Sequence, residues 1–273
     1  MRTVFLIKKY LLTLSLIVIA FASSALSICS WNIANIGQSK NDAEIQFIAK
    51  TIKEFDVIAI QEVVAGDGGA AAIARLSDAL NRMGSKWDYI VSNPTTGSSY
   101  KTERYAFIWK TSKVKLKGKP WLEQQYKIEI DREPYFGTFI DQGREFTLVN
   151  FHAITKSKQP ETEIKYFKFL PQQYANLNII FCGDFHCPQS HSVFNPLKKM
   201  GYTPALIGQK TSLKQKCNND QCLASEYDNI FYKKDLFNVQ KTGIVPFYKS
   251  FTDLAEARKI SDHLPIFIYL ELK

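Results

Sequence analysis

The sequence contains no internal repeat, no low-complexity segment and no stretch rich in proline, glycine and serine that is long enough to separate domains. It therefore gives no sign of a repeat array or of a linker between folded units. It has no second close pair of cysteines or histidines, so a tetrahedral zinc site is not expected. It also lacks an aromatic hairpin or amphipathic helix suited to entering a membrane. With 45% hydrophobic and 22% charged residues, the chain is typical of a globular protein.

Residues 1–27 have the layout of a secretory signal peptide. Three basic residues precede an apolar stretch over residues 10–22, and small residues follow it. An uncleaved membrane anchor is the alternative, but the apolar stretch is short for a bilayer span. We therefore expect a secreted or periplasmic protein with one catalytic domain over residues 28–273.

The formal net charge is +9. Without the three leader cations, 32 basic residues face 26 acidic ones, which leaves a net charge of about +6. A moderately basic exported protein is compatible with nucleic acid or with anionic membranes. Charge alone does not choose between these partners.

Apolar runs of strand length, which alternate at first with helical spacing, indicate an α/β protein. The expected strands are 28–33, 57–60, 89–91, 105–109, 136–140, 146–151, 179–182, 228–231 and 266–270. The expected helices are 43–55, 70–83, 161–169 and 192–200, with a flexible glycine-rich loop at 66–69. Helices that alternate with strands first, followed by hairpin-like strands, predict an α/β sandwich with mixed sheets.

Short polar signatures accompany several of these apolar runs. They are Trp31-Asn32, Gln61-Glu62, Glu103-Arg104-Tyr105, Asn150-Phe151-His152, Gly183-Asp184-Phe185, Tyr227-Asp228 and Ser261-Asp262-His263-Leu264-Pro265. Carboxylates, an amide and two histidines at strand ends can meet in one pocket, which suits binding of a hard cation and proton transfer at a phosphate. In this order the signatures resemble the endonuclease/exonuclease/phosphatase superfamily, and within it most closely the secreted deoxyribonuclease I type of endonuclease.

The resemblance implies a four-layer α/β sandwich, in which two packed mixed β-sheets are flanked by helices and the site lies at one end. Glu62 follows the apolar strand over 56–60, where a carboxylate suits Mg²⁺. The resemblance makes Glu62 the principal metal ligand, while Asn32 supports it or holds a phosphate oxygen. Asp262 is a further expected metal ligand. Mg²⁺ is the expected catalytic ion, and Mn²⁺ is its alternative. The resemblance also allows Ca²⁺ as a structural ion in loops, but the sequence contains no recognisable calcium-binding loop.

Two histidines at strand ends, each with an available carboxylate, suit acid–base catalysis, because a carboxylate fixes the imidazole tautomer and raises its basicity. By resemblance, Glu103 orients His152 and Asp228 orients His263. One pair activates water, and the other protonates the departing oxygen or stabilises its charge. Asp184 lies at the centre and aids the attacking water or the metal. The expected reaction is in-line hydrolysis without a covalent enzyme intermediate.

Several positions concern phosphate and DNA contacts. The family usually has asparagine two residues after Asp184, whereas this chain has His186, which can donate to phosphate or bind a metal but cannot present the amide geometry. Alternatively, the His186 side chain points outward and takes no part in catalysis. Arg132 matches a position that contacts phosphate in the family, and its planar guanidinium suits that contact. The alternative for Arg132 is a surface ion pair with Glu133 or another acidic residue. Tyr100 resembles a tyrosine that packs in the DNA minor groove, but Val64 replaces a groove-binding arginine, which predicts weaker or differently placed duplex binding.

All five cysteines lie beyond the leader, so at least one is expected to stay unpaired in an oxidising compartment. We expect a disulfide between Cys217 and Cys222, because the four residues between them are rich in turn formers. By resemblance, Cys187 with Cys222 is the competing pair. Cys29 and Cys182 lie in apolar runs and are expected to behave as small buried hydrophobic residues.

The predicted function is that of a secreted metal-dependent endonuclease that hydrolyses DNA, with duplex DNA as the expected substrate. A secreted phospholipid phosphodiesterase or phosphoinositide phosphatase is the alternative, because one fold carries these activities. A non-catalytic nucleic-acid-binding protein on a nuclease scaffold is the second alternative. The presence of both His-carboxylate pairs argues against it. We expect a monomer without a stable protein partner.

Overall fold

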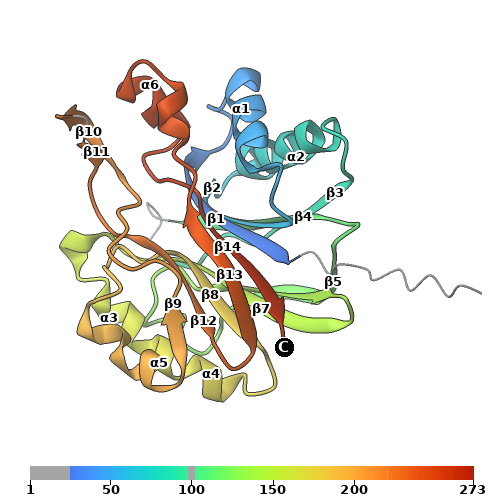
Figure 1. The fold of residues 1–273 in the computed structure, drawn as a ribbon, viewed down its shortest axis with the longest axis vertical. Coiled ribbons are helices and arrows are strands. Elements are labelled where there is room, and N and C mark those ends of the chain that lie inside the picture. Colours follow the sequence, from blue (N-terminus) through green and yellow to red (C-terminus); the bar gives the residue numbers. More distant parts are fainter. Residues whose placement is uncertain (1–24, 98–101, 220) are drawn as a thin grey trace, which may run out of the picture.

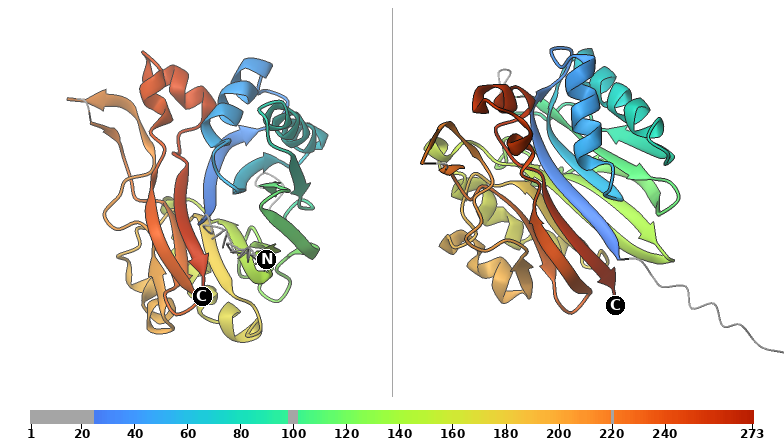
Figure 2. Two further views of the ribbon diagram at one scale, coloured as in Figure 1. Left: turned by 45° about the vertical axis from the view of Figure 1, so that its right-hand side comes forward. Right: turned by 45° about the horizontal axis from the view of Figure 1, so that its top comes forward.

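The computed structural model describes residues 25–97, 102–219 and 221–273. Two six-stranded sheets pack face to face, and helices cover the outer face of each sheet (Figure 1). Two further views show the same layers from other directions (Figure 2). The architecture is the four-layer α/β sandwich with mixed sheets that the sequence predicts.

The first sheet has the strand order β13-β14-β1-β2-β4-β3. Its strands are β1 (Leu26–Ile36), β2 (Val57–Val64), β3 (Trp87–Val91), β4 (Glu103–Lys110), β13 (Phe237–Ile244) and β14 (Ile266–Leu272). β1 and β2 run parallel, and α1 (Asp42–Ile52) connects them. α1 begins with a capping box between Asn41 and Glu44. α2 (Asp67–Asn81) and α6 (Leu254–Ile260) lie with α1 on the outer face of this sheet (Figure 1).

The second sheet has the strand order β5-β6-β7-β8-β12-β9. Its strands are β5 (Val114–Leu122), β6 (Tyr135–Asp141), β7 (Arg144–His152), β8 (Ile179–Asp184), β9 (Tyr202–Pro204) and β12 (Asp228–Lys233). β7 and β8 run parallel, whereas the other neighbours are antiparallel. Its outer face carries α3 (Glu161–Ile164), α4 (Leu170–Gln173) and α5 (Asn195–Lys199). A separate hairpin of β10 (Leu213–Asn218) and β11 (Gln221–Leu223) projects beside α6.

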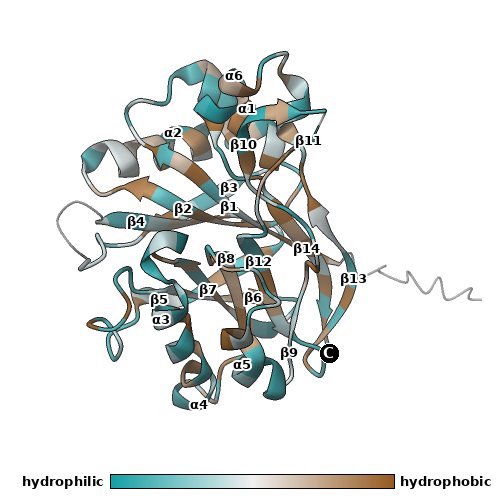
Figure 3. Cartoon of the chain, turned by 90° about the vertical axis from the view of Figure 1, so that its left-hand side faces the viewer, coloured by the Kyte–Doolittle hydropathy of each residue, from teal (hydrophilic) through white to brown (hydrophobic). Residues whose placement is uncertain are grey.

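The central strands are buried on both faces, which explains their continuous apolar runs. On β1, Ile28 packs between the two sheets, whereas Cys29 and Trp31 pack against α1 and α2. On β8, Ile180 faces the layer between the sheets and Phe181 faces the outer helices. Because successive side chains of a strand point to opposite faces, both must be apolar here. Figure 3 shows hydrophobic residues along the central strands and hydrophilic residues on the outer helices.

Each strand that the sequence predicts is present, but β5, β9, β10, β11, β13 and α6 were not predicted. The helix predicted over 161–169 is divided into α3 and a 3₁₀ segment over 165–168, and α4, which begins at Leu170, was not predicted. The loop predicted over 66–69 is wrong, because α2 begins at Asp67. A Cβ on Gly69 would lie 1.9 Å from the Val64 carbonyl oxygen, so glycine lets the helix begin directly against the end of β2.

The predicted leader overlaps the first strand. Residues 1–24 lie outside the described residues, but β1 already pairs Leu26 with Leu270. The backbone N–H and the hydroxyl of Ser27 donate to Asp56 Oδ2 at 3.0 and 2.8 Å. We therefore propose that the leader is cleaved before Leu26. Among the helices of the described ranges, none is long and apolar enough to cross a membrane.

Cys217 and Cys222 form a disulfide across the β10–β11 hairpin, with their Cα atoms 4.2 Å apart. The predicted pairing is confirmed, and the alternative pairing through Cys187 is wrong. Cys29, Cys182 and Cys187 are buried free thiols. Burial raises the pKa of Cys187 to about 11, which keeps this thiol protonated and unreactive at neutral pH.

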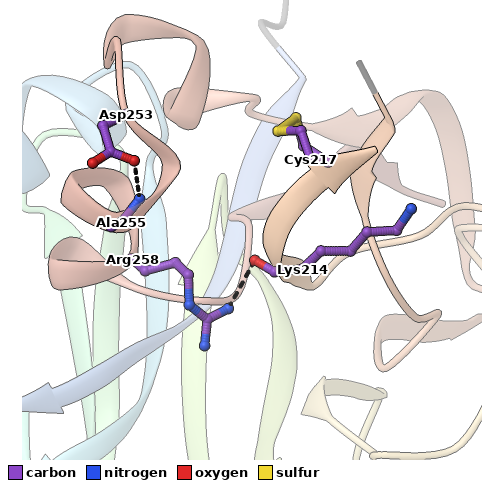
Figure 4. The surroundings of a disulfide bond; sticks show 6 residues. Lys214, Cys217, Asp253, Ala255 and Arg258 are labelled. Carbon is purple, nitrogen blue, oxygen red and sulfur yellow. Dashed lines mark hydrogen bonds between the residues drawn. A yellow bond between two sulfur atoms is a disulfide. The ribbon is translucent and has the colours of Figure 1, made fainter. Parts of the chain in front are cut away.

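The disulfide hairpin is attached to α6 (Figure 4). The Arg258 guanidinium donates to the Lys214 carbonyl oxygen at 3.3 Å and to the Leu213 carbonyl oxygen at 2.9 Å. Asp253 caps the start of the same helix by accepting from the Ala255 N–H at 2.9 Å. The Arg258 bonds hold the base of the hairpin next to α6.

Candidate active site

The sheet topology brings polar strand ends together at one end of the sandwich. β7 and β8 run parallel, and their register places His152 beside Asp184. β12 runs antiparallel to β8, so Asp228 lies on the other side of Asp184. From the facing sheet, Asn32 Nδ2 donates to Asp184 Oδ2 at 3.1 Å. Residues of both sheets therefore meet around one buried carboxylate.

A bulge in β2 directs Glu62 toward this cluster. The register of β2 against β4 shifts between Ile60 and Val63, and Glu62 has a left-handed φ of 59°. The predicted strand end at Ile60 is therefore wrong, because β2 continues and the bulge turns the side chain. Glu62 Oε1 accepts from Asn32 Nδ2, and Glu62 Oε2 accepts from the Asn35 N–H, both at 3.0 Å.

His152 and Glu103 form the first histidine–carboxylate pair. His152 Nδ1 lies 2.9 and 3.0 Å from the two carboxylate oxygens of Glu103. Arg132 supports both partners, because its guanidinium lies 3.5 Å from Glu103 and donates to the carbonyl oxygens of His152 and Ala153. Burial would lower the pKa of His152, but Glu103 outweighs burial and raises this pKa above its ordinary value. With Nδ1 bound to a carboxylate, Nε2 faces the site.

His263 and Asp228 form the second pair. His263 Nδ1 lies 2.8 Å from Asp228 Oδ2, and the Thr211 hydroxyl donates to the same oxygen at 2.7 Å. Burial would lower the pKa of His263, but Asp228 and Asp184 outweigh burial and raise it well above its ordinary value. The raised pKa favours the protonated form of His263, which can donate a proton to a departing oxygen.

Asp184 is fully buried and faces three imidazole rings. Its Oδ2 lies 3.2 Å from Nε2 of His186, 3.4 Å from Nε2 of His263 and 3.7 Å from Nε2 of His152. Burial would raise the pKa of Asp184, but these histidines outweigh burial and hold it below its ordinary value. A charged carboxylate thus lies at the centre of a ring of proton donors and acceptors.

The groups around Glu62 fit a hard divalent cation. Glu62 lines a cavity of about 350 Å³ together with Glu103, Arg132 and His152. Burial would raise the pKa of Glu62, but His152 and Asn32 outweigh burial and lower it, so the carboxylate is charged. Asn32 Oδ1 is buried and has no hydrogen-bond partner. A charged carboxylate and an unpaired amide oxygen are ligands of the kind that Mg²⁺ takes.

The other predicted site residues occupy different positions. The Asp262 carboxylate pairs with Arg258 at 3.2 Å and does not line the cavity beside Glu62. Arg132 is buried against Glu103 and backbone carbonyls, so the alternative of a surface ion pair is wrong. His186 points inward to Asp184, so the alternative of an outward side chain is also wrong. Tyr100 lies outside the described residues.

Sequence reasoning missed residues that hold the site together from a distance. Thr211 supports Asp228, and no sequence pattern marks it. Ser261 donates from its hydroxyl to the Asn32 carbonyl oxygen at 2.6 Å and accepts from the His263 N–H at 2.9 Å. Ser261 belongs to the same sequence motif as His263, and this could have suggested a role in the site. The sequence did not predict that Ser261 joins Asn32 to His263.

Comparison with known proteins identifies similar sequences over most of the chain. The Endonuclease/Exonuclease/phosphatase family matches residues 29–263. A protein named "Deoxyribonuclease" from Thioalkalivibrio sp. (strain K90mix) is 26% identical over 280 residues, which cover 94% of this chain and 74% of that protein. "Deoxyribonuclease gamma" from Rattus norvegicus is 27% identical over 286 residues, which cover 94% of this chain and 88% of that protein.

A solved structure supports the fold. The endonuclease/exonuclease/phosphatase family protein from Leptotrichia buccalis C-1013-b superimposes with a TM-score of 0.65 at 18% identity, covering 90% of this chain and 100% of that chain. At this identity the likeness concerns the fold alone. The match over residues 29–263 shows that the chain belongs to the endonuclease/exonuclease/phosphatase family, which confirms the resemblance seen in the sequence signatures.

Proposed function

We propose that this protein is a secreted endonuclease that hydrolyses DNA phosphodiester bonds and depends on a divalent metal ion. The observation that carries the proposal is the convergence of two histidine–carboxylate pairs. Nε2 of His152 and Nε2 of His263 lie 3.7 and 3.4 Å from the same oxygen of Asp184. Two anchored imidazoles that face one point suit acid–base catalysis at a phosphate. The relatives named deoxyribonucleases favour DNA as the substrate.

In the proposed reaction, each histidine carries one proton transfer. Nε2 of His152 takes a proton from the attacking water, and Nε2 of His263 gives a proton to the departing oxygen. His263 suits the acid role because its pKa is raised well above its ordinary value. A Mg²⁺ or Mn²⁺ ion held by Glu62 and Asn32 would polarise the phosphate and offset developing negative charge. No covalent enzyme intermediate is required.

The compartment, the duplex substrate and the monomeric state are parts of the proposal. The layout of residues 1–27 favours export, and the disulfide between Cys217 and Cys222 fits an oxidising compartment outside the cytoplasm. The net positive charge favours a polyanionic substrate. Duplex DNA offers that charge at high density, and nothing in the proposed reaction requires a second copy of the chain.

Nicking of supercoiled plasmid tests the proposed function directly. The mature protein is expected to convert supercoiled plasmid to the open circular form with Mg²⁺ and to lose this activity in EDTA. Phospholipid vesicles and soluble phosphoinositides are offered to the same preparation. Lipid hydrolysis without nicking would support a phospholipid phosphodiesterase or phosphoinositide phosphatase, and plasmid binding without turnover would support a non-catalytic protein. Either result would contradict the proposal.

Glu62→Gln is expected to raise the Mg²⁺ concentration for half-maximal nicking by at least about 10-fold. The change keeps the shape of the side chain but replaces a charged metal ligand with a neutral one. The measurement is a Mg²⁺ titration of the nicking rate. Glu54→Gln is the matched control, because Glu54 is exposed and its side chain contacts Lys53. Equal Mg²⁺ midpoints for Glu62→Gln and the unchanged protein would place the ion elsewhere.

Asp228→Asn is expected to move the alkaline limb of the pH–rate profile toward lower pH. Asp228 raises the pKa of His263, so the acid form of His263 persists above its ordinary range and is lost only as pH rises through the raised pKa. A neutral amide removes this effect, so the acid form is lost at lower pH. The nicking rate is measured against pH at saturating Mg²⁺. An alkaline limb that does not move would argue against His263 as the proton donor.

A further inference from the structure

A cluster of three aromatic rings lies on the outer layer of the second sheet. Tyr126 comes from the loop after β5, and Tyr166 and Phe169 come from the segment between α3 and α4 (Figure 1). The ring centroid of Tyr126 lies 5.3 Å from that of Tyr166 and 5.9 Å from that of Phe169. Both tyrosines are half-buried, whereas Phe169 is exposed. None of the three lines the cavity beside Glu62, so the cluster is separate from the candidate active site.

The loop after β5 holds an isoleucine out in solvent. The side chain of Ile128 is 89% exposed. On one side of it, the N–H groups of Glu129 and Ile130 donate to the Tyr126 carbonyl oxygen at 3.1 and 2.9 Å, and Ile130 is fully buried. On the other side, the Tyr126 N–H donates to the buried Glu123 carboxylate at 2.6 Å. The loop is therefore fixed at both ends, and Ile128 gains free energy only when something covers it.

Lysines flank the aromatic rings. Lys165 Nζ lies 5.2 Å from the Tyr166 ring centroid, and Lys168 Nζ lies 4.8 Å from the Phe169 ring centroid. Lys127 is exposed at the tip of the loop after β5. Each ammonium group over a ring is a cation–π contact, which holds the charge next to the apolar surface.

Nearby carboxylates offset little of this positive charge. Glu123 is fully buried, and Glu163 is buried and accepts from the N–H groups of Asp131 and Ile154 at 2.6 and 2.9 Å. Both carboxylates are therefore used inside the protein. Glu129 is exposed in the loop, but it faces the three lysines alone among the acidic residues of residues 123–130. The surface thus combines exposed apolar groups with a net positive charge.

These features favour a lipid surface over nucleic acid. Bases stack on free aromatic faces, but here ammonium groups lie over two of the three rings. Ile128 has no ring on which a base could stack. At a membrane, an isoleucine and aromatic rings enter the boundary between headgroups and acyl chains. Lysine side chains beside them keep their ammonium groups at the level of the lipid phosphates.

We propose that this surface docks the protein on anionic phospholipid membranes. The docking patch consists of residues 126–128, 165–166 and 168–169. The sequence did not indicate it, because the patch joins two segments that are distant in the chain and neither is an amphipathic helix or an aromatic hairpin. Docking through one loop and a few lysines is reversible, so it concentrates the exported protein at a cell surface without anchoring it permanently.

The test is sedimentation of the mature protein with lipid vesicles in EDTA, which prevents metal-dependent hydrolysis. Vesicles of phosphatidylcholine alone are compared with vesicles that contain equal amounts of phosphatidylcholine and phosphatidylglycerol. The protein is expected to bind the anionic vesicles at least about 10-fold more tightly than the neutral ones. Salt is expected to weaken this binding. A folded protein that does not sediment with the anionic vesicles would overturn the proposal.

Two isoleucine variants separate the docking patch from general attraction of a basic protein to anionic lipid. Ile128→Ser is expected to weaken binding to the anionic vesicles by about 10-fold, because it removes the exposed apolar side chain. Ile207→Ser is the matched control, because Ile207 is 74% exposed and lies outside the patch. It is expected to bind as the unchanged protein does. Equal affinities of the two variants would contradict the proposal.

A labelled single-stranded oligonucleotide, also in EDTA, tests the competing partner. Ile128→Ser is expected to bind the oligonucleotide as tightly as Ile207→Ser does. A loss of oligonucleotide affinity in Ile128→Ser, with vesicle binding unchanged, would overturn the proposal and assign the patch to nucleic acid. Vesicle binding in EDTA does not depend on DNA hydrolysis. Plasmid nicking therefore succeeds or fails independently of the docking patch, and circular dichroism checks that each variant is folded.

Discussion

His152→Ala and His263→Ala are each expected to reduce metal-dependent plasmid nicking by about 10²–10⁴-fold. Each change removes an Nε2 atom that faces Asp184, so one proton transfer loses its acceptor or its donor. The fold is expected to persist, because the carboxylates left behind keep other partners. Glu103 keeps the Arg132 guanidinium, and Asp228 keeps the Thr211 hydroxyl.

The control is His191→Ala, which removes an exposed histidine whose ring accepts from the Val193 N–H. It is expected to nick plasmid at the unchanged rate. All variants are assayed at saturating Mg²⁺, and circular dichroism compares their secondary structure. The double variant of His152 and His263 is expected to lose little more than either single variant, because groups that act as a unit are not additive. Retention of full activity by either single variant would remove that histidine from the mechanism.

The central part of the fold was predictable because its strands are buried on both faces. β1, β2, β7 and β8 give continuous apolar runs that no exposed element would carry. β5 and β13 each form one edge of their sheets, and they were missed. In β5, apolar residues and lysines alternate over 114–117, which is a strand pattern, but Gly118 and Pro120 interrupt it, so the whole segment gives only a weak strand signal. Pairing with a neighbouring strand, rather than local composition, determines such edges.

The site was predictable where residues belong to recognisable signatures and not where they act from a distance. His152, Asp184 and His263 were expected from their motifs. The bulge that turns Glu62 depends on pairing with β1 and β4, which no local pattern of residues shows. Arg132 was predicted to contact phosphate because it matches a family position, and this stays a prediction, but its bonds to Glu103 and to backbone carbonyls were not predicted. Such bonds depend on tertiary packing.

Gly183→Ala is expected to destabilise the protein by about 3–5 kcal/mol, which lowers Tm by about 10 °C or more. Gly183 pairs with Phe151 in the parallel register of β7 and β8. A Cβ at this position would lie 1.9 Å from the Phe151 carbonyl oxygen, and the φ of +140° is one that L residues rarely adopt. Backbone atoms cannot move aside as a flexible side chain can, so the strands themselves must separate. Thermal unfolding followed by circular dichroism measures the effect.

Gly201→Ala separates the two causes of this loss. Gly201 also has a positive φ, +90°, but an added Cβ there meets nothing within 4 Å. Its substitution is expected to cost only the torsional strain, about 1–2 kcal/mol. A larger loss for Gly183→Ala would assign the difference to the close approach of β7 and β8, the same approach that sets His152 beside Asp184. Equal losses would show that the two strands tolerate a wider separation, and the site would then not require glycine for its geometry.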